Sequence, residues 1–482
     1  MKFLHLWRNN VLWFLLLIPA SYADPVIETV FYDMPESLMP EEIPTPTAAL
    51  IATPGYPDDE ERMTLIARLY LPDPLVHGPG PYPTVLFLHG SGGLWPNNVL
   101  PPNITVNNAP ASQFRDWGNL LVTEGYACLF PDSFHPRGIT GSFEGKRPHS
   151  NPALDDAACS PNYERPKDVV AALTYLVSRP DIDRQNIAMI GFSHGAQTGM
   201  NALVDVSVDR GNYDVDYIAP NAQTIKFAVP SPVRIPHHLP IPKFCAFYYG
   251  GGSHFAYHGQ ASTTVAGRYM LDRRTKAILF HGTDDSLMGI SDHDSDPITG
   301  SVFPIKQVLA SAAQAATLDL PNPILRHYIF NRTAVHAPGE RVGHSFDLGS
   351  VGLADPLDWD TADESPDQKA RRLARQQVLR WLDFSLRPPP AVTITHDPAI
   401  PNPFEIEWST RQRLSYRLMK SLTLQNDWMP LGGWTNGTGD PFSHQAPNES
   451  RAFFSVTYQP QEAPIDALEN EGFFLNYADF GL

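Results

Sequence analysis

Short apolar runs recur along the first 330 residues and alternate with segments of helical period. The runs "YPTVLFL" (residues 82–88) and "NIAMIG" (186–191) are continuous rather than alternating, which is typical of strands covered on both faces. Similar runs predict strands at residues 126–132, 243–250, 276–282 and 324–330. Between them, residues 114–125 and 166–180 have the spacing of amphipathic helices. The alternation predicts an α/β fold with a doubly wound, mostly parallel sheet.

The two ends of this region are also patterned. The segment "AALIA" (residues 48–52) and the alternating "MTLIARLYL" (63–71) predict two further strands around a turn. A long amphipathic stretch at about 367–386 predicts the last helix. Ligands of such sheets bind at the carboxyl ends of the strands, so we expect the functional site there.

The C-terminal part of the chain has a different sequence pattern. A run of three prolines, Pro388–Pro390, stops the helix and forms a stiff linker. Short β-rich segments separated by Asn, Gly, Asp and Pro follow it and predict a small β-sandwich over residues 391–482. Trp408, Trp428 and Trp434 form either a surface for sugars or polymers or part of the sandwich core, and we favour packing.

The first 23 residues have the organisation of a secretory signal peptide. A basic start precedes the apolar stretch Val11–Ile18, which is too short to span a bilayer, and small residues lead to Asp24. We therefore expect removal of residues 1–23, a main domain over residues 24–387, and a secreted or periplasmic location. A retained N-terminal anchor is the alternative.

The net charge limits the expected binding partners, and the cysteine content limits the possible disulfides. The formal net charge of −17 becomes −19 without the signal peptide, which contains Lys2 and Arg8 and no acidic residue. Such a surface repels nucleic-acid phosphates and anionic lipids, so we expect no nucleic-acid partner and no membrane partner after signal cleavage. Cys128, Cys159 and Cys245 allow one disulfide in an oxidising compartment, but the sequence does not choose the pair.

The strongest chemical signal is "GFSHG" (residues 191–195), a Gly-x-Ser-x-Gly between a predicted strand and a predicted helix. A serine hydroxyl is a weak nucleophile that needs a base, a group to orient that base, and donors for the oxyanion. A sharp strand-to-helix turn exposes the hydroxyl, and Gly191 and Gly195 leave room for such a turn. We therefore predict Ser193 as a nucleophile.

A glycine-rich loop upstream supplies candidate oxyanion donors. The segment "HGSGG" (residues 89–93) follows a predicted strand and is similar to loops whose backbone N–H acts with that of the residue after the nucleophile. We expect an oxyanion hole formed by backbone donors near Ser91 and at His194.

The remaining catalytic residues are expected on loops after the late strands, in the order Ser, acid, His. The segment "KAILFHGTDDSL" offers Asp284 and Asp285; we choose Asp285, three residues after the glycine, and keep Asp284 as the alternative. The base is predicted as His344 rather than His336, because His344 lies beside a glycine and shortly before an aromatic residue.

Six motifs in this order resemble exported dienelactone hydrolase-like members of the α/β-hydrolase superfamily: "HGSGG", "PDSFHPRG", "RPKDVVAALTYL", "GFSHG", "HGTDD" and "GHSF". The resemblance covers about Thr64–Leu386 and implies an α/β-hydrolase catalytic domain over residues 24–387. Dienelactone hydrolase proper has a cysteine nucleophile where this chain has Ser193, which favours general ester hydrolysis over dienelactone opening.

The implied activity is cleavage of a small-molecule or polymeric carboxylic ester through an acyl-enzyme. His344 deprotonates Ser193, Asp285 orients the histidine, and water releases the acyl group. No cofactor or metal ion is expected. A serine peptidase on the same fold, and a non-catalytic protein that binds through its β-sandwich, are the alternatives.

Two further side chains are candidates for substrate binding, and one loop is weighed as a metal site. Trp95 begins an insertion after the predicted oxyanion loop. Arg137 is a candidate for binding a substrate carboxylate, although we favour a structural ion pair for it. Asp292, Asp294 and Asp296 alternate as in a calcium loop, but the glycine and glutamate of that loop are missing, so we expect a solvated acidic loop.

Overall fold

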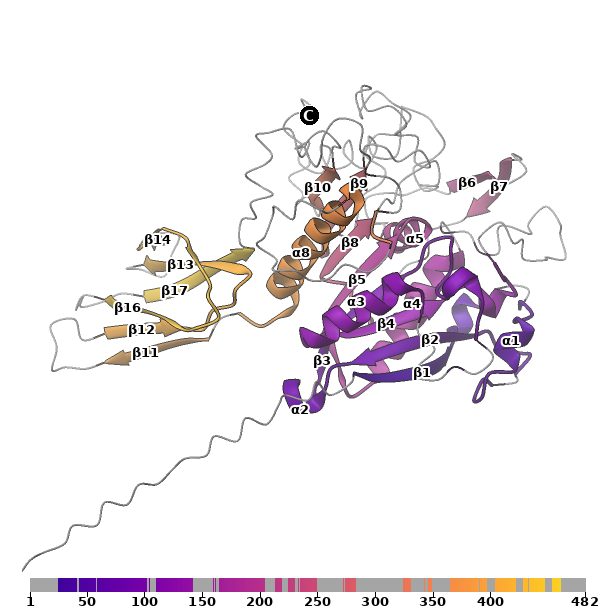
Figure 1. Ribbon diagram of the computed structural model, residues 1–482, viewed down its shortest axis with the longest axis horizontal. Helices are drawn as coiled ribbons and strands as arrows, with labels where there is room; N and C mark the ends of the chain where they lie inside the picture. The colour runs from indigo at the N-terminus through magenta and orange to yellow at the C-terminus, as the bar shows by residue number, and fades with distance from the viewer. Residues whose placement is uncertain are drawn as a thin grey trace, which may run out of the picture.

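The chain contains a large part built around one sheet and a smaller all-β part (Figure 1). The structure is a computed structural model that describes residues 25–40, 43–57, 59–101, 104, 110–141, 159, 161, 164–203, 213–218, 224–229, 233, 235–248, 272, 274–282, 324–330, 342, 346–348, 365–389, 391–396, 404–421, 428–431, 433–446 and 453–460. The predicted signal peptide lies outside these residues. No helix in the described ranges is long and apolar enough to cross a membrane.

The large part is organised by an eight-stranded sheet with the order β1-β2-β4-β3-β5-β8-β9-β10. Its strands are β1 (Val26–Asp33), β2 (Thr64–Leu71), β3 (Tyr82–Leu88), β4 (Ala127–Asp132), β5 (Ile182–Phe192), β8 (Phe244–Tyr248), β9 (Lys276–Gly282) and β10 (Ile324–Phe330). β2 runs antiparallel to both of its neighbours, and every other pair along the sheet is parallel. The predicted doubly wound, mostly parallel sheet of an α/β-hydrolase is confirmed.

Helices cover both faces of this sheet. α4 (Glu164–Ser178) and α5 (His194–Ala202) pack on one face. α3 (Ser112–Thr123) and α8 (Pro366–Leu386) pack on the other. Because successive side chains of a strand point to opposite faces, the continuous apolar runs of the sequence feed two separate cores.

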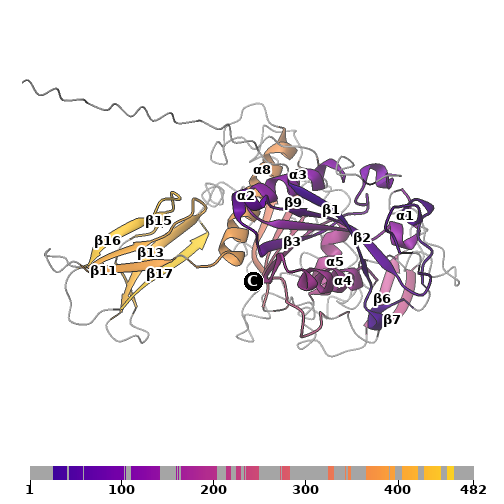
Figure 2. The ribbon, with the colours of Figure 1, turned by 90° about the horizontal axis from the view of Figure 1, so that it is seen from below.

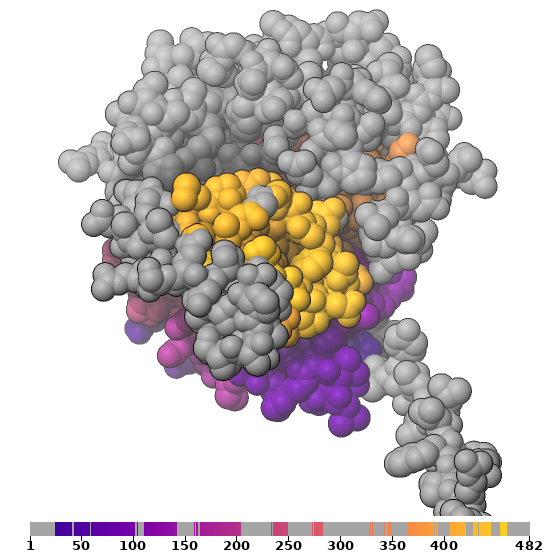
Figure 3. Space-filling view, turned by 90° about the vertical axis from the view of Figure 1, so that its left-hand side faces the viewer, coloured from indigo at the N-terminus to yellow at the C-terminus, as the bar shows by residue number. Residues whose placement is uncertain are grey.

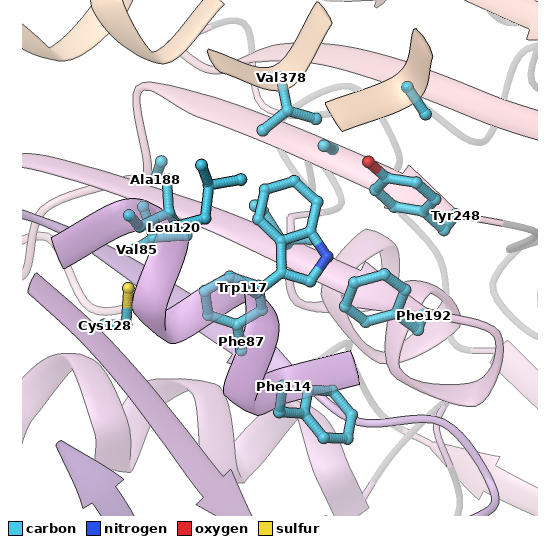
Figure 4. Packing of buried hydrophobic residues seen from close by; sticks show 14 of the residues in the cluster. Val85, Phe87, Phe114, Trp117, Leu120, Cys128, Ala188, Phe192, Tyr248 and Val378 are labelled. Atoms are coloured by element: carbon cyan, nitrogen blue, oxygen red, sulfur yellow. The ribbon is translucent and has the colours of Figure 1, made fainter. Parts of the chain in front are cut away.

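The core beneath α3 and α8 is rich in aromatic side chains. Trp117 of α3 lies against Phe87 and Tyr248, with ring centroids 5.9 and 6.3 Å apart, and Phe192 packs 4.9 Å from Tyr248. Figure 4 shows these rings gathered around Trp117, with Val378 of α8 nearby. Buried aromatic clusters of this kind contribute strongly to stability. Phe192 precedes Ser193, so this core also anchors the end of β5.

One predicted strand is wrong. Residues of "AALIA" form α1 (Ala48–Ile51), because the hydroxyl of Thr47 caps the helix by accepting the N–H of Leu50 at 3.2 Å. Four apolar residues fit a strand or a helix equally well, so the cap decides. The partner of β2 at the edge of the sheet is β1.

Short elements occupy the connections. These are η1 (Glu36–Leu38), α2 (Pro74–His77), η2 (Pro96–Asn98), η3 (His135–Arg137) and the antiparallel hairpin of β6 (Tyr213–Ile218) and β7 (Thr224–Val229). Of these, η2 and η3 follow β3 and β4 and lie on the carboxyl-end side of the sheet, where a site is expected.

The C-terminal part forms two small antiparallel sheets beside the large part (Figure 2). Figure 3 shows the surface of this part, in yellow, facing the viewer. The strands are β11 (Val392–His396), β12 (Phe404–Trp408), β13 (Leu414–Ser421), β14 (Met429–Pro430), β15 (Thr435–Asn436), β16 (Phe442–Ala446) and β17 (Phe453–Pro460). One sheet has the order β11-β12-β16, and in the other β13 pairs with β14, β15 and β17. The predicted β-sandwich is confirmed, and Trp408 lies in its core.

The three cysteines are all buried and unpaired, so the structure contains no disulfide. Burial raises the pKa of Cys159 to about 11 and that of Cys245 to about 12. We therefore expect protein purified without reductant to give three titratable thiols in denaturant and very slow reaction in the native state, since the thiolate is the reactive form. A titration with Ellman's reagent in both states measures this, and a count of one thiol in denaturant would contradict it.

Candidate active site

Ser193 occupies a strained turn between β5 and α5. β5 ends at Phe192, α5 begins at His194, and Ser193 has φ 50° and ψ −115°. A non-glycine residue in such a conformation costs on the order of 1–3 kcal/mol and is characteristic of functional sites. The backbone N–H of Ser193 donates to the carbonyl of Tyr248 at 2.9 Å, which ties the turn to β8. This is the strand, sharp turn and helix that the sequence predicts around the serine.

The glycines around Ser193 allow a close approach of backbone segments. A Cβ on Gly195 would lie 2.1 Å from the carbonyl oxygen of Leu88 at the end of β3, and one on Gly191 would lie 2.7 Å from Cα of Ala196. A Cβ on Gly90 would lie 3.2 Å from the carbonyl oxygen of Phe192. The glycine loop after β3 and the turn at Ser193 are therefore in direct contact, as the sequence predicts for an oxyanion loop.

The loop itself is a tight turn with Ser91 and Gly92 at its tip. The N–H of Gly93 donates to the carbonyl of Gly90 at 3.2 Å, and Gly93 has φ 77°. Ser91 is partly buried and Gly92 is exposed. Gly90, which precedes Ser91, contacts the turn at Ser193, and the role of Ser91 as a backbone donor stays a prediction.

His89 braces this loop from inside the protein. Its Nδ1 lies 2.8 Å from the carbonyl oxygen of Gly90, and its Nε2 accepts the backbone N–H of Ser133 at 3.1 Å. Nε2 as acceptor leaves Nδ1 as donor, so the ring is neutral. Burial, followed by the charge of Arg165, lowers the pKa of His89 to about 3. His89 is therefore a structural residue and not a base.

The buried state of His89 predicts a pH dependence of stability. A histidine whose folded pKa is lowered must take up a proton on unfolding between its unfolded pKa of about 6.5 and its folded pKa, so stability falls as pH falls through this window. We expect His89→Gln to reduce this slope by up to about 1.4 kcal/mol per pH unit. Urea unfolding at pH 6.5, 5.5 and 4.5 measures it, with His237→Gln at an exposed histidine as control. Equal slopes for wild type and His89→Gln would contradict the assignment.

Asp132 is the centre of a buried polar cluster at the end of β4. Its carboxylate accepts the backbone N–H groups of Phe134 and His135 and the Nδ1–H of His135, the last at 2.6 Å. Burial favours the neutral acid, but the contacts with His135 outweigh it and hold the pKa of Asp132 well below its usual value. The same pairing raises the pKa of His135. The cluster is therefore an ion pair.

Trp95 belongs to this cluster rather than to a substrate-binding surface. Its side chain is fully buried, and its indole N–H donates to Asp132 at 2.6 Å. The prediction that Trp95 contacts substrate is wrong for this structure, because the loop folds the ring inward onto a buried carboxylate.

Arg137 adopts the structural alternative that the sequence left open. Its guanidinium pairs with Asp168 through two hydrogen bonds of 2.7 and 2.9 Å and also donates to the carbonyl of Ser133 at 2.8 Å. Both side chains are 1% exposed. Its charge is already balanced, so Arg137 forms the structural ion pair that we favoured and is not the substrate-binding residue that the sequence also offered.

Arg165, which sequence reasoning missed, links the oxyanion loop to the nucleophile turn. Its guanidinium is fully buried at the start of α4, donates to the carbonyl of His89 at 2.9 Å, and donates through Nη1 to Nδ1 of His194. The ring of Phe134 lies 5.5 Å below the guanidinium carbon. Burial lowers the pKa of Arg165 to about 10. The arginine directly precedes a proline in "RPKD", which gave no hint of burial.

The predicted acid and base lie outside the described residues. This holds for Asp284, Asp285, His336 and His344. The aspartates considered as a calcium loop, Asp292, Asp294 and Asp296, also lie outside them. No group of acidic, histidine or cysteine side chains within the described ranges could hold a metal ion.

Described residues on either side of His344 lie close to the nucleophile turn. A Cβ on Gly282, the last residue of β9, would lie 2.2 Å from the carbonyl oxygen of Val342. Phe346 packs 5.9 Å from Tyr248, whose carbonyl accepts the N–H of Ser193. Val342 therefore lies at the carboxyl end of β9, and Phe346 packs at the carboxyl end of β8.

A buried carboxylate, Asp347, follows Phe346. Asp347 is fully buried and accepts hydrogen bonds from Trp117 Nε1 at 2.9 Å, Gln113 Nε2 at 3.1 Å and Arg375 Nε at 3.0 Å. These donors come from α3 and α8, so both helices of one face hold the chain three residues after His344. Sequence reasoning did not identify Asp347.

Comparison with known proteins gives matches only among solved structures. No family profile matches the sequence, and no curated protein matches it. Similar structures include a putative dienelactone hydrolase from Klebsiella pneumoniae subsp. pneumoniae MGH 78578 (13% identity, 74% of this chain and 98% of that chain, TM-score 0.35). An esterase from Thermogutta terrifontis (12%, 68% and 89%, TM-score 0.35) and a putative dipeptidyl aminopeptidase IV from Bacteroides ovatus ATCC 8483 (14%, 75% and 36%, TM-score 0.37) are also similar. We base the assignment of the α/β-hydrolase fold on the strand order of this chain and on its turn at Ser193.

Proposed function

We propose that the chain is a secreted serine hydrolase that cleaves carboxylic esters through an acyl-enzyme on Ser193. The observation that carries the proposal is the left-handed backbone of Ser193, with φ 50°, at the end of a buried parallel strand. A fold maintains such strain only where the surrounding structure compensates for it. At this position the strain presents the hydroxyl above the sheet, beside the glycine loop.

The proposed reaction uses a base and an acid from the two loops after β9 and β10. His344 takes the proton of Ser193 as the hydroxyl attacks the ester carbonyl, and Asp285 holds the imidazole in the required tautomer. Asp284 is the alternative acid. The choice of His344 is supported by its neighbours in the sequence, because Val342 lies against Gly282 at the end of β9 and Phe346 packs on Tyr248 of β8.

Backbone N–H groups near Ser91 and at His194 are proposed to bind the oxyanion of the tetrahedral intermediate. Donors that are already in place before the reaction stabilise developing charge without reorganisation. The contact between Gly195 and Leu88 supports this role, since it sets the two backbone segments side by side. Collapse of the intermediate breaks the ester C–O bond, and the alcohol leaves with the proton held by His344. Water then attacks the acyl-enzyme with His344 as the base, which releases the acid and restores Ser193.

The test is covalent labelling combined with turnover. The chain from Asp24 to Leu482 is treated with a fluorophosphonate, and peptide mass mapping locates the adduct. Labelling of Ser193 together with hydrolysis of short and medium p-nitrophenyl esters supports the proposal. Turnover of aminoacyl p-nitroanilides in place of the esters would instead indicate a peptidase, and absence of both labelling and turnover would exclude a serine hydrolase.

The secreted location rests on residues 1–23 and is tested separately. We expect the exported protein to begin at Asp24 when it is isolated from culture medium or periplasm of an expressing bacterium. N-terminal sequencing measures this, and an intact Met1 on a membrane-bound product would favour the retained anchor.

A further inference from the structure

Two buried arginines lie behind the proposed site, and within the described residues only one of them pairs with a carboxylate. Arg137 pairs with Asp168, and the neighbouring Asp132 pairs with His135. For Arg165, the part of the chain that the structure describes contains no such ion pair; its contacts are the carbonyl of His89 and the ring of His194. Burying an unbalanced charge costs several kcal/mol. Arg165 contacts both the glycine loop after β3 and the start of α5, so it is placed to hold these two segments together.

The two acceptors of Arg165 belong to the two backbone segments that supply the proposed oxyanion donors. His89 begins the loop that leads to Ser91, and His194 is the residue after the nucleophile. A guanidinium is planar and rigid, so it sets the distance between two acceptors in a way that a flexible ammonium does not. Arg165 thus bridges the two halves of the oxyanion hole from the protein interior.

The contact with His194 also fixes the state of that ring. Arginine is only a donor, so Nδ1 of His194 must be an acceptor and the proton lies on Nε2. This makes His194 a neutral ring beside Ser193 rather than a second base. In addition, a hydrogen bond from a charged donor to the carbonyl of His89 polarises the peptide unit that it shares with Gly90.

We propose that Arg165 is the positioning residue of the oxyanion hole: its buried guanidinium joins the carbonyl of His89 to the ring of His194 and supplies a positive charge behind the developing oxyanion. The proposal rests on the proposed function of Ser193. Arg165 does not touch substrate. It acts on the rate of acyl transfer through the backbone segments it holds, and substrate binding in the ground state is left nearly unchanged.

The test compares Arg165→Gln and Arg165→Lys with the wild-type chain from Asp24 to Leu482. We expect Arg165→Gln to lower kcat for p-nitrophenyl esters about 10²-fold, the usual loss when an oxyanion contact is removed, with KM within about threefold. Arg165→Lys keeps the charge but not the fork and is expected to lose about tenfold in kcat. Comparison of Arg165→Lys with Arg165→Gln therefore separates the effect of the positive charge on kcat from the effect of the two hydrogen bonds.

Affinity for a boronic acid, which forms a tetrahedral adduct on the serine, gives a second readout. If Arg165 positions the oxyanion hole, the inhibition constant rises in parallel with the loss of kcat, because both report stabilisation of the tetrahedral species. The control is Arg68→Gln, which removes a buried guanidinium of β2 that donates to Thr29. We expect this control to leave kcat, KM and boronate affinity as in the wild type.

The outcomes separate the two proposals. Wild-type kcat in Arg165→Gln, or a loss of kcat with unchanged boronate affinity, overturns the role of Arg165 while Ser193 labelling still supports the hydrolase. If Arg165→Gln does not fold, Arg165→Lys decides: a parallel loss in kcat and boronate affinity supports the bridge, and wild-type values overturn it. A wild type without labelling or turnover overturns both proposals.

Discussion

Substitution of Ser193 by alanine is expected to lower kcat for ester hydrolysis by about 10⁴-fold or more, the loss seen when a catalytic unit of this kind loses its nucleophile. The physical reason is that no acyl-enzyme forms without the hydroxyl. His344→Ala is expected to cause a loss of the same order, and the double variant little more, because the two residues act together. Steady-state kinetics with p-nitrophenyl acetate and butyrate measure all three.

The control for this prediction is Ser178→Ala. The hydroxyl of Ser178 donates to the carbonyl of Tyr175 at the end of α4, away from the turn at Ser193. The Ser178→Ala substitution removes a serine hydroxyl, as Ser193→Ala does, and is expected to leave kcat unchanged. A Ser193→Ala variant that still turns over like this control would show that any esterase activity arises elsewhere in the chain.

The same assay separates the two acid candidates. Asp285→Asn keeps the size of the side chain but presents an amide to the histidine, which favours the wrong tautomer, and such changes lower kcat by about 10⁴-fold. Asp284→Asn is expected to leave most of the activity. The reverse pattern would assign the acid to Asp284, and two active variants would remove both residues from the mechanism.

The fold follows from the sequence where burial is continuous. The runs at residues 85–88, 187–192, 244–248 and 277–280, within β3, β5, β8 and β9, contain no charged residue. A sheet covered on both faces accommodates four such runs joined by amphipathic helices. The run at α1 is too short for this argument. There a single capping hydroxyl on Thr47 outweighs β-strand pattern.

The burial of the charged side chains near Ser193 could not be predicted from the sequence. Arg165 and Asp168 are charged residues near the start of α4, Asp132 ends β4, and His135 and Arg137 lie in η3. Charged side chains normally indicate solvent exposure. Their burial depends on pairing across three separate segments. A single sequence does not reveal such pairing, so Arg137 looked available for substrate although its charge is balanced.

Replacement of Gly195 by alanine is expected to destabilise the protein by about 3 kcal/mol or more and to lower kcat by at least about 10²-fold. Its Cβ would lie 2.1 Å from the carbonyl oxygen of Leu88 and 2.6 Å from that of His89. Both are backbone atoms of the β3 end, which cannot rotate away, so the two segments must separate. A displacement of about 1 Å at a catalytic site is enough for the expected loss of rate.

Gly92→Ala is the matched control, because it adds the same methyl group to the oxyanion loop at a position with nothing within 4 Å. We expect its free energy of unfolding to stay within about 0.5 kcal/mol of the wild type. Urea unfolding and kcat for p-nitrophenyl acetate, measured on both variants, separate crowding at the turn from a general sensitivity of the loop. A stable, active Gly195→Ala variant would mean that the strand end and the turn do not approach each other as closely as the oxyanion hole requires, and the roles given to Ser91, His194 and Arg165 would lose their common support.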